Sequence, residues 1–437
     1  MSQFSTPDVV NLFKRVYGDL QNLLPEDFPL ASDIPFSSKQ KVGEKYIEAV
    51  ALTYETGITF GGSNMVAFEI NPAIAGSVQQ AEVIPYSSVL GSLVPWGVIS
   101  RSAGGGDKAF FDATKYIVKN NLRSHGGFLE DIRLYGQGDK LLGYVSYYTG
   151  TYRGTTLTNG TGTVNGIAFT NGVSAASKAI LFNKGFFAAG LWVGKEGALI
   201  QEVNASGVVV QEGKLVSVNP DYGYITVDFT PTAASSLVSH RLKFKGMGGG
   251  EAMGVYAILT ASPSLFGIPT NQYSLWSGNI YDCGAQKFSL KKLQEGVAQA
   301  VGRGGLDGDL VVYVNPRTWA GMVVTEAGLR MYDSSYKTGE AQNGFESITF
   351  YHQTGKATIK AHRKVMEGDA FALHLPDWSR SGSAEISFTV PGMDKEVIYP
   401  VENMAAYAFR SYSDQYVFNH APARSIYFKN IDDESAS

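Results

Sequence analysis

A long stretch of alternating residues near the N-terminus constrains the fold of this chain more than any other feature. It runs from Glu44 to Ser102, and its alternating segments are separated by Gly-rich turns. One such segment places side chains on a shared face at Tyr46, Glu48, Val50, Leu52 and Tyr54. This pattern predicts a long two-stranded ribbon rather than a compact layer. Because an isolated ribbon is marginally stable in water and exposes two edges, it needs a neighbour.

The two ends of the chain also predict extended structure. Thr6 and Pro7 are placed to begin an amphipathic helix, and the segment PEDFPLASDIPFSSKQK that follows it reads as an arm that must lie on something to be ordered. Near the C-terminus, AAYAFRSYSDQYVFNHAPARSIYFKNI alternates strongly and predicts long strands. The acidic ending IDDESAS, residues 431–437, is expected to be disordered.

Composition bounds the class of protein. A chain of 437 residues exceeds the size of a single core, so two or three domains are expected. The net charge is −4 and no basic block occurs, which argues against binding nucleic acid through a cationic patch. The single cysteine, Cys283, cannot form an intramolecular disulfide or a zinc site by itself. No signal peptide or run of eighteen apolar residues is visible, so we expect no membrane association and a chain that stays inside a cell at first.

A helix of about thirty residues is predicted after the glycines at 104–106. Its pattern begins at Asp107, is broken at Gly126 and Gly127, and resumes to Tyr135. A Gly-rich loop before a helix can bind phosphate. Because no GxxxxGK[ST] motif and no preceding apolar strand occur, we interpret these glycines as a hinge.

The segment from Thr151 to Gly267 differs in composition from its surroundings. It contains three Asn-Gly pairs and several short apolar stretches separated by turn residues. The pattern predicts an all-β module, a barrel or sandwich inserted between two parts of a mixed domain.

A mixed α/β pattern follows this module. Ser289 to Val301 predicts a helix, Leu310 to Val314 a buried strand, and Arg317 to Ala327 a second helix. Further strands are predicted at residues 347–351, 356–361 and 370–375. The first strand stops at Asn315-Pro316, because proline has no N–H for the ladder, and Trp319 supplies a large apolar anchor.

The sequence contains no recognisable catalytic or metal-binding motif. The six histidines form no HExxH or HxH pair, and no GxSxG surrounds a serine. Asp369 and Asp377 lie in turns, where aspartate usually accepts backbone hydrogen bonds. We therefore predict no catalytic residue, no cofactor and no metal site.

Taken in order, these segments resemble the major capsid proteins of tailed phages. That resemblance implies an α+β Hong Kong 97-like capsid fold with an inserted all-β domain. By position, residues 1–43 resemble the N-terminal arm, 44–103 the hairpin called the E-loop, and 104–150 the spine helix with the start of the peripheral and axial domains. The remaining segments resemble an inserted β domain (151–267), the axial domain (268–365), the return to the peripheral domain (366–430) and a tail (431–437).

The resemblance also implies a function. The chain would self-assemble through hexamers and pentamers into the icosahedral head shell of a tailed phage, in the host cytoplasm and then in the virion. Its partners would be copies of itself, a separate scaffolding protein, a portal protein, a decoration protein, and packaged double-stranded DNA that is bound without sequence specificity. The candidate assembly residues are Phe60, Phe68, Trp96, Gly126, Gly127, Asn315, Pro316 and Trp319.

Two other functions fit parts of the sequence. An encapsulin-like compartment has the same fold, although such shells are usually shorter and lack a large insertion. A β-rich protein that binds or degrades carbohydrate would also account for the many tyrosines, tryptophans and turns.

Overall fold

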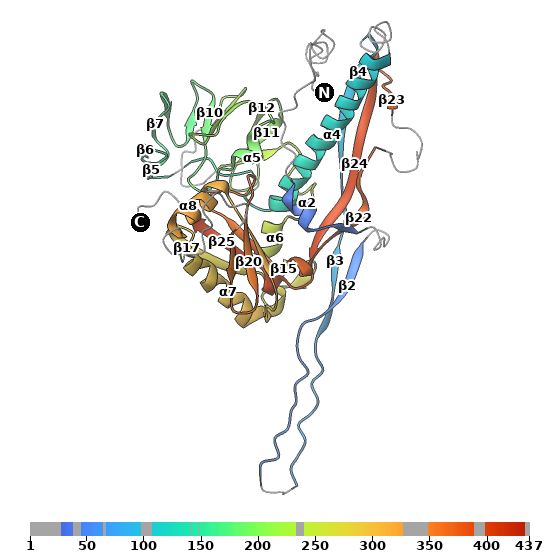
Figure 1. Ribbon diagram of the computed structural model, residues 1–437, viewed down its shortest axis with the longest axis vertical. Helices are drawn as coiled ribbons and strands as arrows, with labels where there is room; N and C mark the ends of the chain where they lie inside the picture. Colours follow the sequence, from blue (N-terminus) through green and yellow to red (C-terminus); the bar gives the residue numbers. More distant parts are fainter. Residues whose placement is uncertain are drawn as a thin grey trace, which may run out of the picture.

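The computed structural model describes residues 28–37, 45–63, 67–97, 107–140, 142–146, 148–232, 240–326, 348–388 and 398–432. The predicted N-terminal helix at Thr6 and Pro7 and the glycines at 104–106 lie outside these residues. Within them, the chain forms a body of mixed helices and sheets from which one thin ribbon projects (Figure 1). No helix in the described part is long and apolar enough to cross a membrane.

The projecting ribbon includes β2 (Tyr46–Ala51), β3 (Val78–Val83) and the described residues between them, 52–63 and 67–77. The two strands pair antiparallel from Tyr46 opposite Val83 to Ala51 opposite Val78. Further out, Thr56 and Ile74 form an isolated bridge. The predicted ribbon is confirmed, but its predicted end at residue 102 is wrong. The chain turns after Val83, and β4 (Tyr86–Pro95) leaves the ribbon to pair along the whole length of a strand in the body.

That body strand is β24 (Ala406–Asn419), the longest strand of a five-stranded sheet. The sheet also contains β1 (Phe36–Ser37), β22 (Trp378–Ser387) and β23 (Ile398–Pro400). The long helix α4 (Asp107–Tyr135) lies beside β24 and β4 (Figure 1). Its polar side chains reach the sheet, since the Asn121 amide donates to Ser92 Oγ at 2.8 Å and to the Leu90 carbonyl at 3.2 Å.

Helix α4 runs without interruption through Gly126 and Gly127, so the predicted break is wrong. The short helix α2 (Pro29–Asp33) explains the first of the two glycines. A Cβ atom on Gly126 would come within 3.2 Å of the Phe28 ring, and one on Gly127 within 3.8 Å of Lys364 Nζ. Gly126 therefore permits a close approach of Phe28 to the helix, whereas a Cβ atom on Gly127 would make only ordinary contacts.

The segment predicted as an all-β module is rich in strands among its described residues. Six strands form one sheet in the order β14-β11-β12-β13-β10-β9, and two small hairpins lie beside it. Two short helices, α5 (Ala189–Trp192) and α6 (Val255–Leu259), interrupt the segment. The strands are β5 (Gly150–Tyr152), β6 (Thr155–Leu157), β7 (Gly162–Val164), β8 (Ile167–Phe169), β9 (Val173–Ser174), β10 (Ala179–Leu181), β11 (Leu199–Val203), β12 (Val209–Asn219), β13 (Tyr224–Val227) and β14 (Arg241–Phe244).

The apolar core of this segment is continuous with the core of the body. Phe182, Trp192 and Ile200 belong to the same buried cluster as Leu134 of α4 and Phe418 of β24. The segment therefore shares part of its core with the body, whereas a smaller buried cluster that includes Leu157, Phe169 and Tyr224 belongs to the segment alone.

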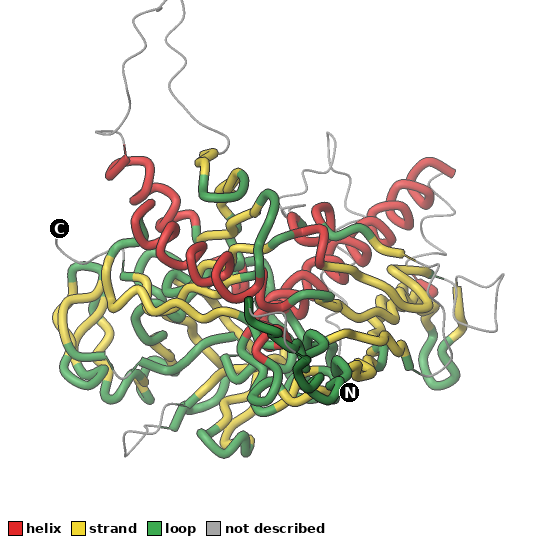
Figure 2. The backbone as a smooth tube through the Cα atoms, turned by 90° about the horizontal axis from the view of Figure 1, so that it is seen from below, coloured by secondary structure: helices red, strands yellow, loops and turns green. Residues whose placement is uncertain are grey.

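A second six-stranded sheet carries the mixed α/β pattern, with α7 (Leu290–Gly304) and α8 (Pro316–Glu326) packed beside its strands. Viewed along the ribbon, the helices of the molecule gather toward one face and the strands make up most of the rest (Figure 2). The strand order is β17 (Asn279–Gln286), β25 (Ile426–Ile431), β21 (Ala370–Leu373), β18 (Leu310–Val314), β20 (Lys356–Ala361) and β19 (Ile348–Tyr351). The predicted strands and helices of this region are confirmed to within a few residues. Ser289 caps α7 by accepting a hydrogen bond from the Lys292 N–H.

The predicted start of the disordered tail at residue 431 is wrong. Ile431 is buried at the end of β25, and Lys184 forms an ion pair with Asp432 at 2.8 Å. Residues 433–437 lie outside the described part of the chain.

Short elements complete the fold. They are β15 (Ser264–Leu265), β16 (Ile268–Pro269) and the 3-10 helices η1 (Ser274–Trp276), η3 (Leu375–Asp377) and η4 (Pro422–Arg424).

Candidate assembly surfaces

The base of the ribbon is built into the body by apolar packing. The ring of Tyr46 lies 5.5 Å from that of Tyr416 and 5.6 Å from that of Phe418, both on β24. Leu52 and Ala81 are also buried. Burial of these side chains anchors both strands of the ribbon where they leave the body.

Polar contacts fix the same base from several directions. The Glu82 N–H donates to the Phe266 carbonyl at 2.9 Å, and the Ser77 and Tyr273 hydroxyls lie 3.0 Å apart. On the other strand, Glu48 pairs with His420 at 2.7 Å. The lower part of the ribbon is therefore held at a defined angle to the body.

Beyond Leu52, the described residues of the ribbon expose large apolar side chains. Tyr54 is 88% exposed, Phe60 82% and Ile70 83%, and Phe68 is 56% exposed with its ring over Gly61. Ile58, Ile74 and Val78 are exposed as well. A run of exposed apolar residues on a projecting ribbon is a surface that needs a partner. We call residues 53–63 and 67–76 the distal ribbon.

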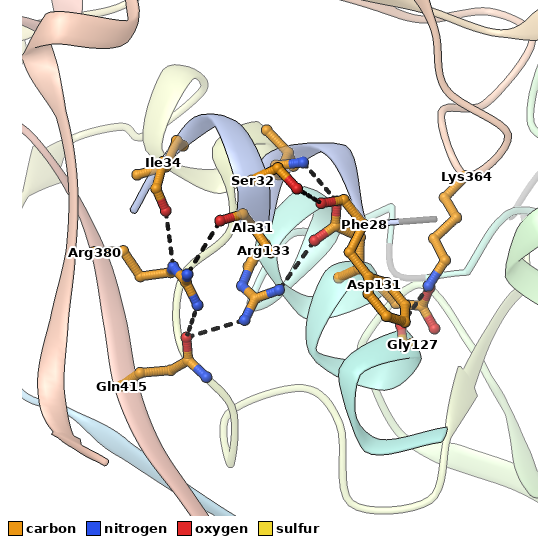
Figure 3. A network of polar contacts seen from close by, with 12 residues as sticks. Phe28, Ala31, Ser32, Ile34, Gly127, Asp131, Arg133, Lys364, Arg380 and Gln415 are labelled. Atoms are coloured by element: carbon orange, nitrogen blue, oxygen red, sulfur yellow. Dashed lines mark hydrogen bonds and ion pairs between the residues drawn. The ribbon is translucent and has the colours of Figure 1, made fainter. Parts of the chain in front are cut away.

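A buried polar network joins α2, α4 and the five-stranded sheet (Figure 3). The Arg380 Nε donates to the Ile34 carbonyl at 3.0 Å, and its Nη2 donates to the Ala31 carbonyl at 3.2 Å. Arg380 and Arg133 both donate to Gln415 Oε1 at 3.1 Å. Two arginines and a glutamine thereby connect the N-terminal segment to the helix and to β24.

Glu130 compensates the charge of this network. It is fully buried, and it accepts from Arg133 at 3.0 Å and from the Leu30 N–H at 2.8 Å. Burial by itself would raise the pKa of Glu130, but the hydrogen bond from His362 and the charge of Arg133 outweigh burial and lower it to about 2. Burial, and then the neighbouring Arg380, lower the pKa of Arg133 to about 10.

Asp131, the next residue of α4, forms a second buried cluster. It pairs with Lys364 at 2.9 Å and with Lys195, and Lys364 also donates to the Gly127 carbonyl. Burial lowers the pKa of Lys195 to about 8. The two clusters tie successive residues of α4 to the N-terminal segment on one side and to the β-rich segment on the other.

The Asn-Pro pair at the end of β18 has a clear local role. The Asn315 side chain accepts from the Arg317 N–H at 2.9 Å and donates to the Val365 carbonyl at 2.7 Å. Pro316 is the first residue of α8. Asn315 thus caps the helix and Pro316 starts it, and Trp319 packs against the core of the sheet.

The candidate assembly residues do not form one site. Phe60 and Phe68 lie on the distal ribbon, whereas Trp96 lies just past β4, 47% exposed, with its ring 6.0 Å from that of Tyr407. Gly126 of α4 lies against Phe28 of the N-terminal segment, and the Asn-Pro pair lies at the end of β18, an interior strand of its sheet. Any role of these residues in assembly requires several separate contacts.

Sequence reasoning did not find the residues that hold these parts together. The contacts of Glu130 with His362, of Arg133 with Gln415 and of His420 with Glu48 span long sequence separations, so no local pattern marks them. One local signal was available: in LEDIRL, Glu130 and Arg133 stand three residues apart, a spacing that places opposite charges side by side on a helix.

The described part of the chain holds no group of three or more histidine, cysteine or acidic side chains arranged to bind a metal. Asp369 is buried, paired with Lys140, and accepts from the hydroxyls of Tyr135 at 3.0 Å and Tyr427 at 2.8 Å. Asp377 pairs with His374 at 2.7 Å. These contacts give both aspartates a structural role.

Comparison with known proteins places this fold. No protein-family model matches the chain, and no curated protein sequence matches it. A chain of the cyanophage A-1(L) capsid asymmetric unit is similar, with 9% identity over 96% of each chain and a TM-score of 0.53. A chain of the native GTA particle capsid has 7% identity over 96% of this chain and 95% of its own, with a TM-score of 0.49. A chain of Mycobacterium phage Bobi has 10% identity over 98% and 99%, with a TM-score of 0.42. The likeness to the cyanophage chain confirms the predicted α+β, Hong Kong 97-like capsid fold.

Proposed function

We propose that this chain is a major capsid protein, which self-assembles into the icosahedral head shell of a tailed double-stranded DNA phage. One observation carries the proposal: the distal ribbon exposes tyrosine, phenylalanine and isoleucine side chains that its own body does not cover. A fold similar to a cyanophage capsid chain supports it. In this proposal, the ribbon is the E-loop, α4 is the spine helix, and the second six-stranded sheet belongs to the axial domain.

The anchored base of the ribbon and its exposed distal half suit assembly into a shell. A rigid base sets the direction in which the ribbon leaves the body, and the apolar distal half is then buried against an adjacent copy. Because each copy both presents a ribbon and receives one, many modest contacts add up to a stable shell. This function implies that copies of the chain assemble into hexamers and pentamers. It also implies several partners: a scaffolding protein, a portal protein, a decoration protein and packaged DNA.

The charge of the chain agrees with containment of DNA without tight binding. A net charge of −4 with no basic block leaves the phosphates of a packaged genome to their own counterions. The proposal assigns no catalytic step to any residue.

Assembly of the purified full chain tests this proposal. The chain, expressed with and without a scaffolding protein encoded beside it, should form closed shells in negative-stain microscopy and sediment as particles. Replacing Phe60 and Ile70 together by aspartate should abolish the shells, whereas aspartate at Val216, which is 55% exposed on β12, should leave them intact. A chain that remains a monomer and binds glycans would refute the proposal. Particles that enclose a copurifying enzyme would favour an encapsulin-like compartment instead.

A further inference from the structure

A buried lysine and a buried aspartate meet between the end of α4 and strands β21 and β25. Lys140 is 7% exposed and Asp369 0%, and Lys140 Nζ contacts Asp369 Oδ1. Each carboxylate oxygen also accepts from a tyrosine: Oδ1 from the Tyr427 hydroxyl at 2.8 Å and Oδ2 from the Tyr135 hydroxyl at 3.0 Å. The amine and the two hydroxyls therefore hold the carboxyl group in one position. We call Lys140 and Asp369 the buried pair.

Aromatic rings enclose the nitrogen of the buried pair. Lys140 Nζ lies 4.8 Å from the ring centre of Phe186 and 5.3 Å from those of Tyr256 and Tyr427. Burial lowers the pKa of Lys140, although the charge of Asp369 acts in the opposite direction. Transfer of one proton within the pair gives a neutral amine and a neutral acid, which are less costly to bury than two ions. A desolvated, neutral lysine amine is a nucleophile.

The two tyrosines keep the protons that they donate to the carboxyl group. Burial, followed by the charge of Asp369, raises the pKa of both Tyr135 and Tyr427 well above its ordinary value. Both hydroxyls are therefore donors at neutral pH. Hydrogen-bond donors that already point at a carboxyl group can stabilise negative charge that develops on it during a reaction.

A second buried cluster of lysine and aspartate lacks this arrangement. Asp131 contacts two lysines, Lys364 and Lys195, rather than one. Among the described residues, no tyrosine hydroxyl donates to the carboxylate of Asp131. One amine, one carboxyl group and two phenol donors come together at the buried pair, and Asp131 therefore serves as an internal control.

We propose that Lys140 and Asp369 condense to an amide bond within one chain. The neutral amine attacks Cγ of the protonated carboxyl group, and the Tyr135 hydroxyl stabilises the negative charge that develops on Oδ2. Tyr427 donates its proton to Oδ1 as this oxygen leaves, and regains a proton from the attacking nitrogen. One C–N bond forms and one C–O bond breaks. An ammonium and a carboxylate thus become one amide and one water, without an oxidant, a reductant or a cofactor.

The surroundings of the buried pair suit this reaction. The fold holds the amine and the carboxyl group in contact, so no entropy is lost in bringing them together. A pocket of about 390 Å³, lined in part by Lys140 and Tyr427, adjoins the pair and can receive the released water. The bond joins positions 229 residues apart in the sequence and connects the end of α4 to the second six-stranded sheet. Closing so long a loop restricts the unfolded chain and thereby stabilises the folded one.

The intact mass of the purified full chain, measured in denaturant, tests the bond. After removal of the N-terminal methionine is accounted for, the native chain should be lighter by one water than its sequence. Lys140→Arg keeps the positive charge, but a guanidinium does not form this amide, so the K140R chain should have its full sequence mass. A native chain with its full sequence mass would overturn the proposal.

Tryptic digestion of the denatured chain locates the bond. Peptides 134–153 and 365–380 contain Lys140 and Asp369, and they should appear as one branched species. In the same digest, Asp131 and Lys364 should remain in separate peptides. A branched species that joins Asp131 to Lys364 as well would show that the two tyrosine donors do not select the buried pair.

Tyr427→Phe tests the proton donor, because it keeps the ring and removes the hydroxyl. Bond formation should slow at least about tenfold, measured as the linked fraction in chains sampled at intervals after synthesis. Tyr281→Phe is the matched control, since the Tyr281 hydroxyl contacts Glu295 on α7 instead, and it should link at the native rate. Circular dichroism verifies that both variants are folded. Equal rates in Y427F and the native chain would overturn the role of Tyr427.

The bond and the proposed shell function fail independently. Shells built from chains of full sequence mass would overturn the bond and leave the shell function standing. A linked chain that forms no shells would do the reverse.

Discussion

Substitution of Glu130 tests whether the buried network fixes the N-terminal segment to α4. Glu130→Gln keeps the shape of the side chain but removes the charge that compensates Arg133. In the folded chain its pKa is about 2, against an ordinary value of 4.5. By linkage, that difference corresponds to about 3 kcal/mol of folding free energy at neutral pH. Leaving a buried charge without its partner costs about 3–5 kcal/mol in other proteins, which agrees in magnitude.

Urea unfolding of the unassembled subunit at pH 7, followed by circular dichroism, measures this effect. We expect E130Q to unfold at lower urea with an unchanged slope, and to lose about 3 kcal/mol of stability. Glu385→Gln is the matched control, because Glu385 also pairs with an arginine of the network, Arg380, but has a side chain that is 48% exposed. An exposed pair contributes less than about 1 kcal/mol.

The pH dependence gives the same prediction a second readout. Because the folded pKa of Glu130 lies below its ordinary value, its stabilising contribution is complete above pH 4.5 and is lost as the pH falls toward 2. The E130Q subunit should lack this part of the acid destabilisation. If E130Q were no less stable than E385Q, or kept the full acid dependence of the native chain, the network would not hold the segment as described.

Three further predictions concern packing, titration and capping. On α7, a Cβ atom on Gly296 would collide with the Phe428 ring, whereas one on Gly302 would meet nothing within 4 Å. In urea unfolding, Gly296→Ala should therefore destabilise the subunit by about 1–3 kcal/mol, and Gly302→Ala should stabilise it by up to about 1 kcal/mol. Equal effects of the two substitutions would contradict the packing of Gly296 against Phe428. Burial and then the charge of Arg133 lower the pKa of His125 to about 4, so the free energy of unfolding should fall as the pH drops from 6.5 toward 4. The His125→Asn subunit should lose less stability than the native chain over this pH range. An unchanged pH profile would refute the assignment. Asn315→Ala removes the cap of α8 and should cost about 1–2 kcal/mol, seen as a lower melting temperature, and an unchanged melting temperature would argue against the cap.

Local patterns in the sequence predicted the elements whose periodicity is strong. The alternation at Tyr46 to Tyr54 gave the ribbon, and the apolar run at Leu310 to Val314 gave a buried strand that stops at the Asn-Pro pair. Each of these depends on neighbours along the chain, so single-sequence reasoning captures them.

The errors arose where distant segments decide the structure. Gly126 and Gly127 were interpreted as a helix break, but the helix continues through both, and the missing side chain of Gly126 accommodates Phe28 from the N-terminal segment. Strand β4 read as part of the ribbon, because pairing with β24, more than three hundred residues later, leaves no local mark.

Hydrogen exchange of the ribbon amides tests the central claim, that an adjacent copy covers the distal ribbon. In the unassembled subunit, amides of the distal ribbon should exchange rapidly, while those of β18 should be protected. In assembled particles, the distal ribbon should gain protection and β18 should change little. Distal-ribbon amides that exchange equally fast before and after assembly would contradict the claim.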